Sequence, residues 1–197
     1  MQWDLIDSVN FRIDNEFEVC YLIEMENGVS NMQPYIWFLI GFPGVGKSTY
    51  RKEFFEKHIE NPVILSTDDL IEDVARHRGL TYNDVFKETI GEATDYFFDA
   101  LEKSLADDKS VVIDRTNLTK KSRKRILNMV PDHYKKIAVV VYCNEEVQKE
   151  RLAERKGKHI PSHVIESMIK TYDNPIPQEG FDSITYVCTD QKDSNID

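Results

Sequence analysis

The 197-residue sequence has no apolar run near the length, about 18 residues, that a membrane-spanning helix requires. Residues 1–4 are not followed by the apolar core of a signal peptide. The three cysteines, Cys20, Cys143 and Cys188, lie far apart without C-x-x-C spacing, which argues against a disulfide framework and a zinc site. Internal repeats and low-complexity stretches are also missing. We therefore expect a cytoplasmic globular protein whose cysteines are buried free thiols.

Basic residues are concentrated in one part of the chain. The net charge of −10 by itself argues against a nucleic-acid partner. Residues 115–158, however, contain 13 Lys or Arg and 5 Asp or Glu, whereas the first 34 residues contain seven acids and one arginine. A basic segment on an acidic protein suits a polyanionic ligand held in one place. Alternatively, the five basic residues within 120–125 form a solvated helix face.

The apolar pattern predicts an α/β fold in which strands and helices alternate along the chain. The strands are continuous apolar runs, which is typical of a parallel sheet covered by helices on both faces. We expect strands at 35–40, 62–66, 110–114, 136–142 and 184–188. We expect helices at about 47–58, 69–77, 82–106, 119–130, 145–155 and 161–173. Residues 35–189 then form the main domain, and 190–197 form a polar, flexible tail.

Residues 1–34 carry a weaker structural signal and are expected to form an N-terminal extension. Residues 11–14 and 17–24 alternate between apolar and polar side chains, which predicts a β-hairpin that turns near Asp14 and Asn15. We prefer the interpretation that this hairpin is structural decoration. An added sheet edge, a dimer contact and a substrate flap are the alternatives.

A glycine-rich segment connects the apolar run at 35–40 to a segment with helical spacing. It matches the pattern G-x-x-x-x-G-K-[ST] in full, with the sequence Gly41-Phe42-Pro43-Gly44-Val45-Gly46-Lys47-Ser48. Its glycines let backbone N–H groups point at phosphate oxygens, so strand, loop and helix N-terminus together form an anion site. Alternatively, the segment is a Gly-Pro turn that binds nothing.

This loop motif implies ATP and Mg²⁺ as ligands. The Lys47 ammonium would reach the β- and γ-phosphates, and the Ser48 hydroxyl would bind Mg²⁺. The residues expected to bind the nucleotide are Gly41, Pro43, Gly44, Val45, Gly46, Lys47, Ser48 and Thr49.

Polar and acidic residues follow two predicted strands at the edge where parallel sheets bind ligands. These strand endings are Ser66-Thr67-Asp68-Asp69 and Asp114-Arg115-Thr116-Asn117. A kinase that acts on a hydroxyl benefits from a carboxylate that orients this hydroxyl and takes its proton, and Asp68 is our candidate. Asp68 is alternatively a helix N-cap, although Asp69 fits that position better. Asp114 is expected to hold Mg²⁺ through water, or else to stabilise the turn.

Two arginines near residue 150 predict a lid. Arg151 and Arg155 lie four residues apart and so share one face of the predicted helix. Gly157 interrupts this helix, and the segment from Lys158 begins the next one. Two helices joined by such a break can move, and their arginines would then bring positive charge to the phosphoryl group that is transferred. Alternatively, the arginines pair with glutamates on an ordinary surface helix.

Together these motifs resemble the P-loop polynucleotide 5′-hydroxyl kinases of phages, the kinase domain of the eukaryotic kinase-phosphatases, and the related zeta-toxin-like kinases. The matching segments are 41–49, 66–69, 111–117, 151–161 and 158–181. The resemblance implies a three-layer P-loop kinase fold, with a parallel sheet, helices on both faces and a helical lid.

The resemblance also implies roles for single residues. Lys47 and Ser48 would bind the ATP phosphates and Mg²⁺, and Asp68 would be the general base. Arg155 would stabilise the transition state from the lid, with Arg151 as a second lid arginine. The residues that would lie beside the acceptor are Asp68, Asp114, Arg115, Thr116 and Asn117.

The sequence differs from the phage kinases at two positions that would contact the acceptor. The phage enzymes place one arginine just before the base and another three residues after it, to hold the acceptor phosphate. Thr67 and Ile71 occupy these positions here, and Arg115 is a candidate replacement for the missing charge. No phosphatase signature is present.

We expect an ATP-dependent kinase that acts on a hydroxyl of a nucleic acid (DNA or RNA), first of all a polynucleotide 5′-OH end. One alternative acceptor is the hydroxymethyl group of 5-hydroxymethyluracil in DNA, and another is a small molecule or nucleoside. The alternative outside the enzymes is an ATP-dependent binding module without an acceptor.

Overall fold

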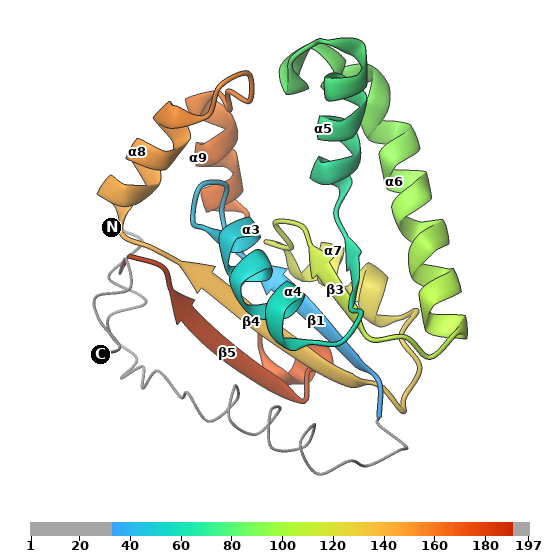
Figure 1. The fold of residues 1–197 in the computed structure, drawn as a ribbon. Coiled ribbons are helices and arrows are strands. Elements are labelled where there is room, and N and C mark those ends of the chain that lie inside the picture. Colours follow the sequence, from blue (N-terminus) through green and yellow to red (C-terminus); the bar gives the residue numbers. More distant parts are fainter. Residues whose placement is uncertain (1–32, 191–197) are drawn as a thin grey trace.

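The computed structural model describes residues 33–190 (Figure 1). The predicted N-terminal hairpin and nearly all of the predicted tail lie outside this part of the chain. Within it, five parallel strands form one sheet in the order β2-β3-β1-β4-β5. The strands are β1 (Tyr35–Ile40), β2 (Val63–Leu65), β3 (Val111–Asp114), β4 (Lys135–Tyr142) and β5 (Ser183–Cys188). The predicted α/β fold with a parallel sheet is confirmed.

The central strand β1 is buried on both faces, which explains its unbroken apolar sequence. It pairs with β3 on one side and with β4 on the other. Because side chains alternate along a strand, Ile36, Phe38 and Ile40 belong to one hydrophobic core and Trp37 and Leu39 to a second core across the sheet. The chain visits β2 and β3 on one side of β1 before it crosses to β4 and β5, so the order reverses at β1.

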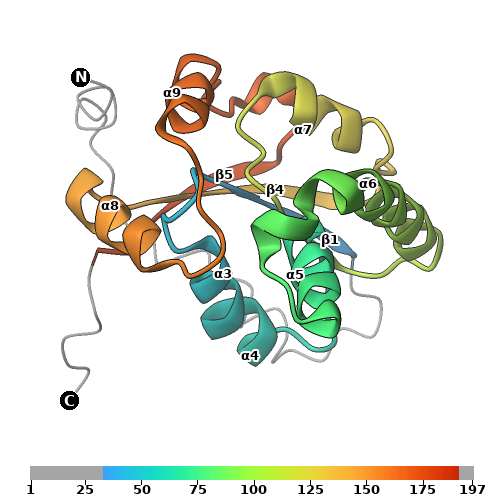
Figure 2. The same cartoon turned by 90° about the horizontal axis from the view of Figure 1, so that it is seen from above.

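Helices cover both faces of the sheet (Figures 1 and 2). One core includes Phe97 of α6 and Ile126 of α7, and the other includes Phe54 and Phe55, which follow the loop after β1. The helical segments are α3 (Lys47–Tyr50), η1 (Arg51–Phe55, a π-helical turn), α4 (Glu56–His58), α5 (Thr67–Arg78), α6 (Tyr82–Ala106), α7 (Lys120–Leu127), α8 (Glu145–Glu154), α9 (Ser162–Lys170) and η2 (Pro177–Glu179).

Two groups of helices flank the carboxyl edge of the sheet. Figure 1 shows α5 and the start of α6 on one side of this edge, and α8 and α9 on the other. Helices α5 and α6 pack through a small core of their own, formed by Ile71, Ala75, Val85 and Ala93. The loop after β1 lies between the two groups (Figure 2), so this edge of the sheet has walls on both sides.

Helix α5 begins at Thr67, earlier than the predicted start near Asp69. Ser66 is the N-cap, because its Oγ accepts a hydrogen bond of 3.1 Å from the backbone N–H of Asp69. The interpretation of Asp68 as the cap is therefore wrong, and so is the preference for Asp69 in that position. Both carboxylates belong to the first turn of the helix, where they are free for other contacts.

Helix α7 is not the fully solvated basic face that the sequence suggested. Arg123 is completely buried and forms a bidentate ion pair with the nearly buried Glu179, with distances of 2.8 and 2.7 Å. A third hydrogen bond, of 2.8 Å, runs from Arg123 to the carbonyl of Asp173. Lys121, Lys124 and Arg125 are exposed as expected. Arg123 therefore fastens residues 173–179 to α7.

Two further expectations from the sequence concern disulfide bonds and membrane-spanning helices. Cys143 and Cys188 are free thiols, and Cys20 lies outside the described residues. Among residues 33–190, none of the helices combines the length and the apolar character needed to cross a membrane.

Candidate active site

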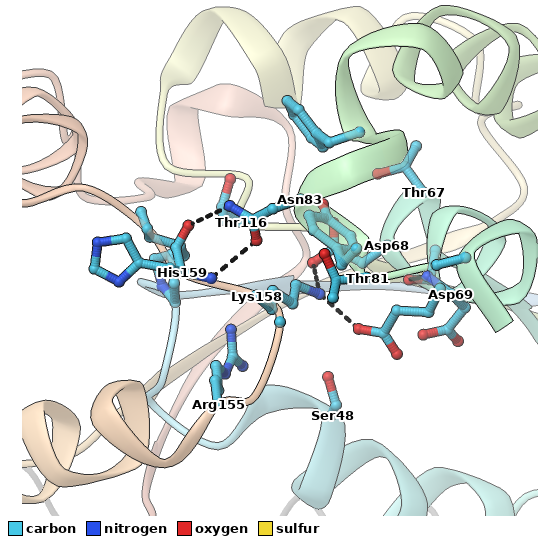
Figure 3. Close-up of a pocket in the computed structure, with 18 of the residues that line it drawn as sticks. Ser48, Thr67, Asp68, Asp69, Thr81, Asn83, Thr116, Arg155, Lys158 and His159 are labelled. Carbon is cyan, nitrogen blue, oxygen red and sulfur yellow. Dashed lines mark hydrogen bonds and ion pairs between the residues drawn. The ribbon is translucent and has the colours of Figure 1, made fainter. Parts of the chain in front are cut away.

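A cavity of about 990 Å³ opens at the carboxyl edge of the sheet (Figure 3). Its walls are the loop after β1 and the helix that follows it, α5, the start of α6, the turn after β3, residues 155–161 between α8 and α9, and part of α9. It lies where the strand order reverses, which is where open parallel sheets bind ligands. Lys47, Ser48, Asp68, Asp114, Arg115, Thr116 and Arg155 all line it, as predicted from the sequence.

The loop after β1 depends on its glycines. Gly44 and Gly46 have φ angles of 86° and 92°, in the left-handed region that other residues rarely adopt. A Cβ at Gly41 would lie 2.4 Å from the carbonyl oxygen of Val141, so the chain passes too close there for any side chain. Such a tight backbone cradle fits the phosphates of a nucleotide.

Contacts from α8 and from the end of β5 hold this loop in shape. Gln148 is buried and donates a hydrogen bond of 2.8 Å to the carbonyl of Pro43. The Thr189 hydroxyl donates one of 2.7 Å to the carbonyl of Val45. The cradle is therefore preorganised by side chains outside the motif itself.

Lys47 is folded back onto the loop that precedes it. Its Nζ donates hydrogen bonds of 2.8 and 3.0 Å to the carbonyls of Gly41 and Phe42. Burial lowers the pKa of Lys47 to about 8, although Asp114 and Asp68 oppose this shift. Nearby anionic phosphates would favour the charged form of Lys47.

Ser48 and Asp114 lie together, as a magnesium site of this type requires. The Ser48 hydroxyl is 3.4 Å from Oδ2 of Asp114. Burial raises the pKa of the Asp114 carboxyl, and Lys47 and Arg51 oppose the shift. No group of three or more His, Cys, Asp or Glu side chains in residues 33–190 forms a metal cluster. The two oxygens therefore fit Mg²⁺, which commonly keeps water and phosphate ligands beside one or two from the protein.

Arg51 is a site residue that the sequence analysis missed. Its guanidinium is only 6% exposed and lies 3.0 Å from Asp114, 2.6 Å from Asp69 and 3.1 Å from Glu56. Arg51 and Asp114 are both buried, whereas Asp69 and Glu56 are half exposed, and the contact with Arg51 fixes the orientation of the Asp114 carboxylate. The spacing of four residues from Lys47 places Arg51 one helical turn further along, and this signal could have identified it.

The Asp68 carboxylate faces the cavity and is held by two other side chains (Figure 3). Its Oδ1 accepts a hydrogen bond of 2.8 Å from the Tyr82 hydroxyl, and its Oδ2 accepts one of 2.8 Å from Lys158. Burial would raise the pKa of Asp68, but the Lys158 ammonium and the Tyr82 hydroxyl outweigh burial and lower it. Asp68 is therefore ionised at neutral pH and able to orient a hydroxyl donor.

The segment between α8 and α9 is closed over this carboxylate. Lys158 also contacts Glu72, at 2.7 Å, and lies over the Tyr82 ring with Nζ 4.2 Å from the ring centroid. The Asn83 side chain forms two hydrogen bonds of 2.9 Å with the backbone N–H and C=O of His159 (Figure 3). We call residues 155–161 the lid loop. Its contacts with α5 and α6 were not visible in the sequence, because they join residues up to 90 positions apart.

The two predicted lid arginines have different surroundings. Arg155 lines the cavity and forms no hydrogen bond or ion pair with another described residue. Arg151 lies outside the cavity walls and donates to the hydroxyl and the carbonyl of Thr189, at 2.9 and 2.8 Å. Arg155 directly follows α8 as its C-cap residue, so of the two arginines only the one at the end of the helix borders the cavity.

Not all of the predicted acceptor residues in the turn after β3 border the cavity. Arg115 and Thr116 line it, whereas the predicted acceptor residue Asn117 is buried and points inward. The Asn117 amide donates a hydrogen bond of 2.8 Å to the carbonyl of Leu39, and its φ of 49° shapes the turn. Asn117 therefore positions the turn and has no surface in the cavity.

Comparison with known proteins agrees with this geometry. The model of a family described as an AAA domain matches residues 36–175. The L-seryl-tRNA(Sec) kinase of Methanococcus maripaludis is 29% identical over 166 residues, which are 80% of this chain and 60% of that protein. This chain therefore spans about three fifths of the length of that relative.

Solved structures share the fold at low sequence identity. A protein from Chloroflexus aurantiacus, provisionally described as a kinase, has a TM-score of 0.61 and 17% identity, with 80% of this chain and 86% of that one covered. A chain of the Pnkp1/Rnl/Hen1 RNA repair complex has a TM-score of 0.55 and 22% identity, with 74% and 46% covered. At such identities the likeness shows the fold alone. The expected P-loop kinase-like α/β fold is confirmed.

Proposed function

The chain belongs to this AAA domain family of P-loop proteins, and from that premise we propose that it is an ATP-dependent kinase for a hydroxyl of a nucleic acid, with a polynucleotide 5′-OH end as the acceptor. The observation that carries the proposal is the position of Asp68. Its carboxylate lines the same cavity as Lys47, Ser48 and Asp114, yet it belongs to a different wall. A carboxylate in this position can orient the hydroxyl group of a second substrate and accept its proton.

The donor half of the site would hold ATP and Mg²⁺. The loop 41–48 would surround the phosphates, and Lys47 would exchange its two carbonyl contacts for phosphate oxygens. Ser48 and Asp114 would hold Mg²⁺, which neutralises charge on the β- and γ-phosphates when it is bound. Arg51 would keep Asp114 in place, and the unpaired guanidinium of Arg155 would add positive charge from the lid loop.

The acceptor half would use Asp68 as the general base. The acceptor hydroxyl oxygen forms a bond to the γ-phosphorus, and the bond between this phosphorus and the bridging oxygen of ADP breaks. The hydroxyl proton passes to Asp68, and ADP leaves with the bonding electron pair. Lys158 occupies one oxygen of Asp68 in this structure, so the acceptor hydroxyl would share or replace that contact.

A nucleic-acid acceptor is supported by two relatives and by the charge distribution. One relative is named as a kinase of seryl-tRNA, and one fold neighbour belongs to an RNA repair complex. The 13 basic residues among 115–158 lie on a chain of net charge −10, and part of this segment borders the cavity. A phosphate-rich acceptor fits such a local excess of positive charge.

A small uncharged acceptor is the second candidate, and one observation favours it. Thr67 and Ile71 stand where phage kinases hold the acceptor phosphate with arginines, and these uncharged side chains are only 6% and 0% exposed. An ATPase switch without an acceptor is less well supported, because such a protein has no use for a carboxylate beside a second substrate.

Phosphoryl transfer from γ-labelled ATP to a panel of acceptors tests the proposal. The panel consists of 5′-OH DNA, 5′-OH RNA, DNA with 5-hydroxymethyluracil, seryl-tRNA, nucleosides and simple sugars. We expect label on a 5′-OH oligonucleotide, with the same oligonucleotide carrying a 5′-phosphate as the matched inactive control. Label on nucleosides or sugars alone would support the second candidate, and label released only as inorganic phosphate would contradict the kinase proposal.

A further inference from the structure

Two arginines stack on consecutive phenylalanines of α6. The guanidinium carbon of Arg115, in the turn after β3, lies 4.9 Å from the centroid of the Phe97 ring. The guanidinium carbon of Arg125, in α7, lies 3.8 Å from the centroid of the Phe98 ring. Stacking on a ring face fixes the plane of a guanidinium and leaves its N–H groups free at the edge. Both arginines are therefore held ready for a ligand.

Neither guanidinium is in direct contact with an anion in the part of the chain that the structure describes. There, the side chains of Arg115 and Arg125 form no ion pair and no hydrogen bond. The two are close enough to interact, because Arg125 adds to the effect of burial in lowering the pKa of Arg115. Two neighbouring cations with no anion in direct contact repel each other, and an anion bound between them would reduce this repulsion.

The pair connects the cavity with the outer surface. Arg115 lines the cavity and is near enough to Asp68 for the two charges to interact. Arg125 is exposed on α7, together with Lys121 and Lys124. Figure 2 shows α7 beside α6, so the exposed basic residues of α7 lie next to the helix on which Arg115 stacks.

We propose that Arg115 and Arg125 form the acceptor-phosphate site, which binds the phosphodiester next to the reacting hydroxyl and guides the strand outward over α7. Arg115 contacts the phosphate nearest to the hydroxyl at Asp68, and Arg125 contacts the strand further out. The positive charge thus comes from the turn after β3 and from α7, whereas Thr67 and Ile71 of α5 carry no charge. This inference rests on the proposed function and specifies which part of the acceptor is recognised.

Arg115→Gln and Arg125→Gln test the site with three acceptors that contain the same nucleoside. These are a 5′-OH oligonucleotide, a nucleoside 3′-phosphate and the free nucleoside. We expect Arg115→Gln to raise KM about tenfold for both phosphate-containing acceptors, with little change in KM for ATP or for the free nucleoside. Arg125→Gln should raise KM for the oligonucleotide more than for the nucleoside 3′-phosphate, because Arg125 lies further from the hydroxyl.

Salt dependence gives a second readout that a structural role would not change. Each arginine that neutralises a phosphate of a single strand adds about 0.7 to the slope of log affinity against log salt. We expect either substitution to reduce the slope for the oligonucleotide by about this amount. Arg115→Lys should restore part of the affinity. Lys57→Gln is the matched control, since Lys57 is an exposed lysine paired with Glu53 on α4, and it should leave KM and slope unchanged.

The outcomes separate this inference from the proposed function. If the wild-type protein phosphorylates the oligonucleotide but both substitutions leave KM and slope unchanged, the acceptor-phosphate site is wrong while the kinase proposal survives. If the wild-type protein transfers phosphate to no acceptor, the proposed function fails. The site is then tested by the binding of the 5′-OH oligonucleotide, measured by fluorescence anisotropy, and equal affinities of wild type and Arg125→Gln would overturn it. Arg125 is exposed, so this substitution is not expected to disturb the fold.

Discussion

At the scale of single residues, the candidate site depends on a few charged groups whose surroundings change their chemistry. Lys47 is held by two carbonyl oxygens, and burial lowers its pKa to about 8. The surroundings of Asp68 favour its charged form instead, because Lys158 and Tyr82 stabilise the carboxylate and lower its pKa. Asp114 is buried beside Arg51 and Lys47. The site therefore combines a cation of lowered basicity with a carboxylate that stays ionised.

The pKa of Lys47 predicts how ATP affinity changes with pH. A cationic Lys47 attracts the phosphates, and this charge is lost as pH rises through about 8 in the free protein. Phosphate groups have already lost their last proton above pH ~7. We therefore expect the Kd for ATP, measured by calorimetry, to increase by about tenfold between pH 7 and pH 9.5.

The matched variant for this measurement is Lys47→Arg, whose side chain keeps its charge over the whole range. The Kd of this variant should change much less with pH, whatever its absolute value. A wild-type Kd that stays constant from pH 7 to pH 9.5 would show that the charge of Lys47 does not titrate in this range.

At the scale of elements, the lid loop 155–161 connects two groups of helices across the cavity. Lys158 reaches Asp68 and Glu72 of α5, and Asn83 of α6 binds the backbone of His159. A substrate that enters must pass this closed loop or displace it. The loop also places Arg155 in the cavity wall, so a movement of this loop would change the positive charge in the cavity.

The Lys158–Asp68 ion pair predicts a shift in the pH profile of the kinase. Lys158 lowers the pKa of Asp68, so Lys158→Met should let it rise. If ionised Asp68 is required, the acidic limb of kcat/KM for the acceptor moves to higher pH in this variant, because kcat/KM reports the free enzyme. The measurement is the pH dependence of kcat/KM from pH 4 to pH 8.

Glu72→Gln is the comparison for Lys158→Met. It removes the other anionic partner of Lys158 and leaves the ion pair with Asp68 in place. The acidic limb of Glu72→Gln should not move to higher pH. An acidic limb that is the same in the wild type and in Lys158→Met would mean that Lys158 does not control the ionisation of the proposed base, Asp68.

At the scale of the whole molecule, the parallel sheet decides where the chemistry can take place. Strand order reverses at β1, so the loop 41–48, the start of α5 and the turn after β3 all meet at one edge. This much could be predicted from the sequence, because continuous apolar strands and the glycine-rich motif are local patterns. For the same reason Lys47, Ser48, Asp68 and Asp114, which local patterns single out, all border one cavity.

The remaining features depend on contacts between distant residues, which local patterns do not contain. Arg51 and Arg123 look like ordinary basic residues of surface helices, yet both are buried in ion pairs. Nothing in the local pattern around Arg151 indicates its hydrogen bonds to Thr189, which is 38 positions away. The closed lid loop depends on Asn83, whose partner is 76 positions away.

The most direct test of the account compares γ-phosphate transfer to a 5′-OH oligonucleotide by the wild-type protein and by Asp68→Asn, with ATP affinity measured in parallel. The matched control is Asp73→Asn, an exposed carboxylate of the same helix that pairs with Arg76. We predict that Asp68→Asn lowers kcat by about 10²- to 10⁴-fold, with a Kd for ATP within about twofold of the wild type, and that Asp73→Asn changes neither. Transfer by Asp68→Asn at the wild-type rate would contradict the assignment of Asp68 as the base and with it the two-substrate site.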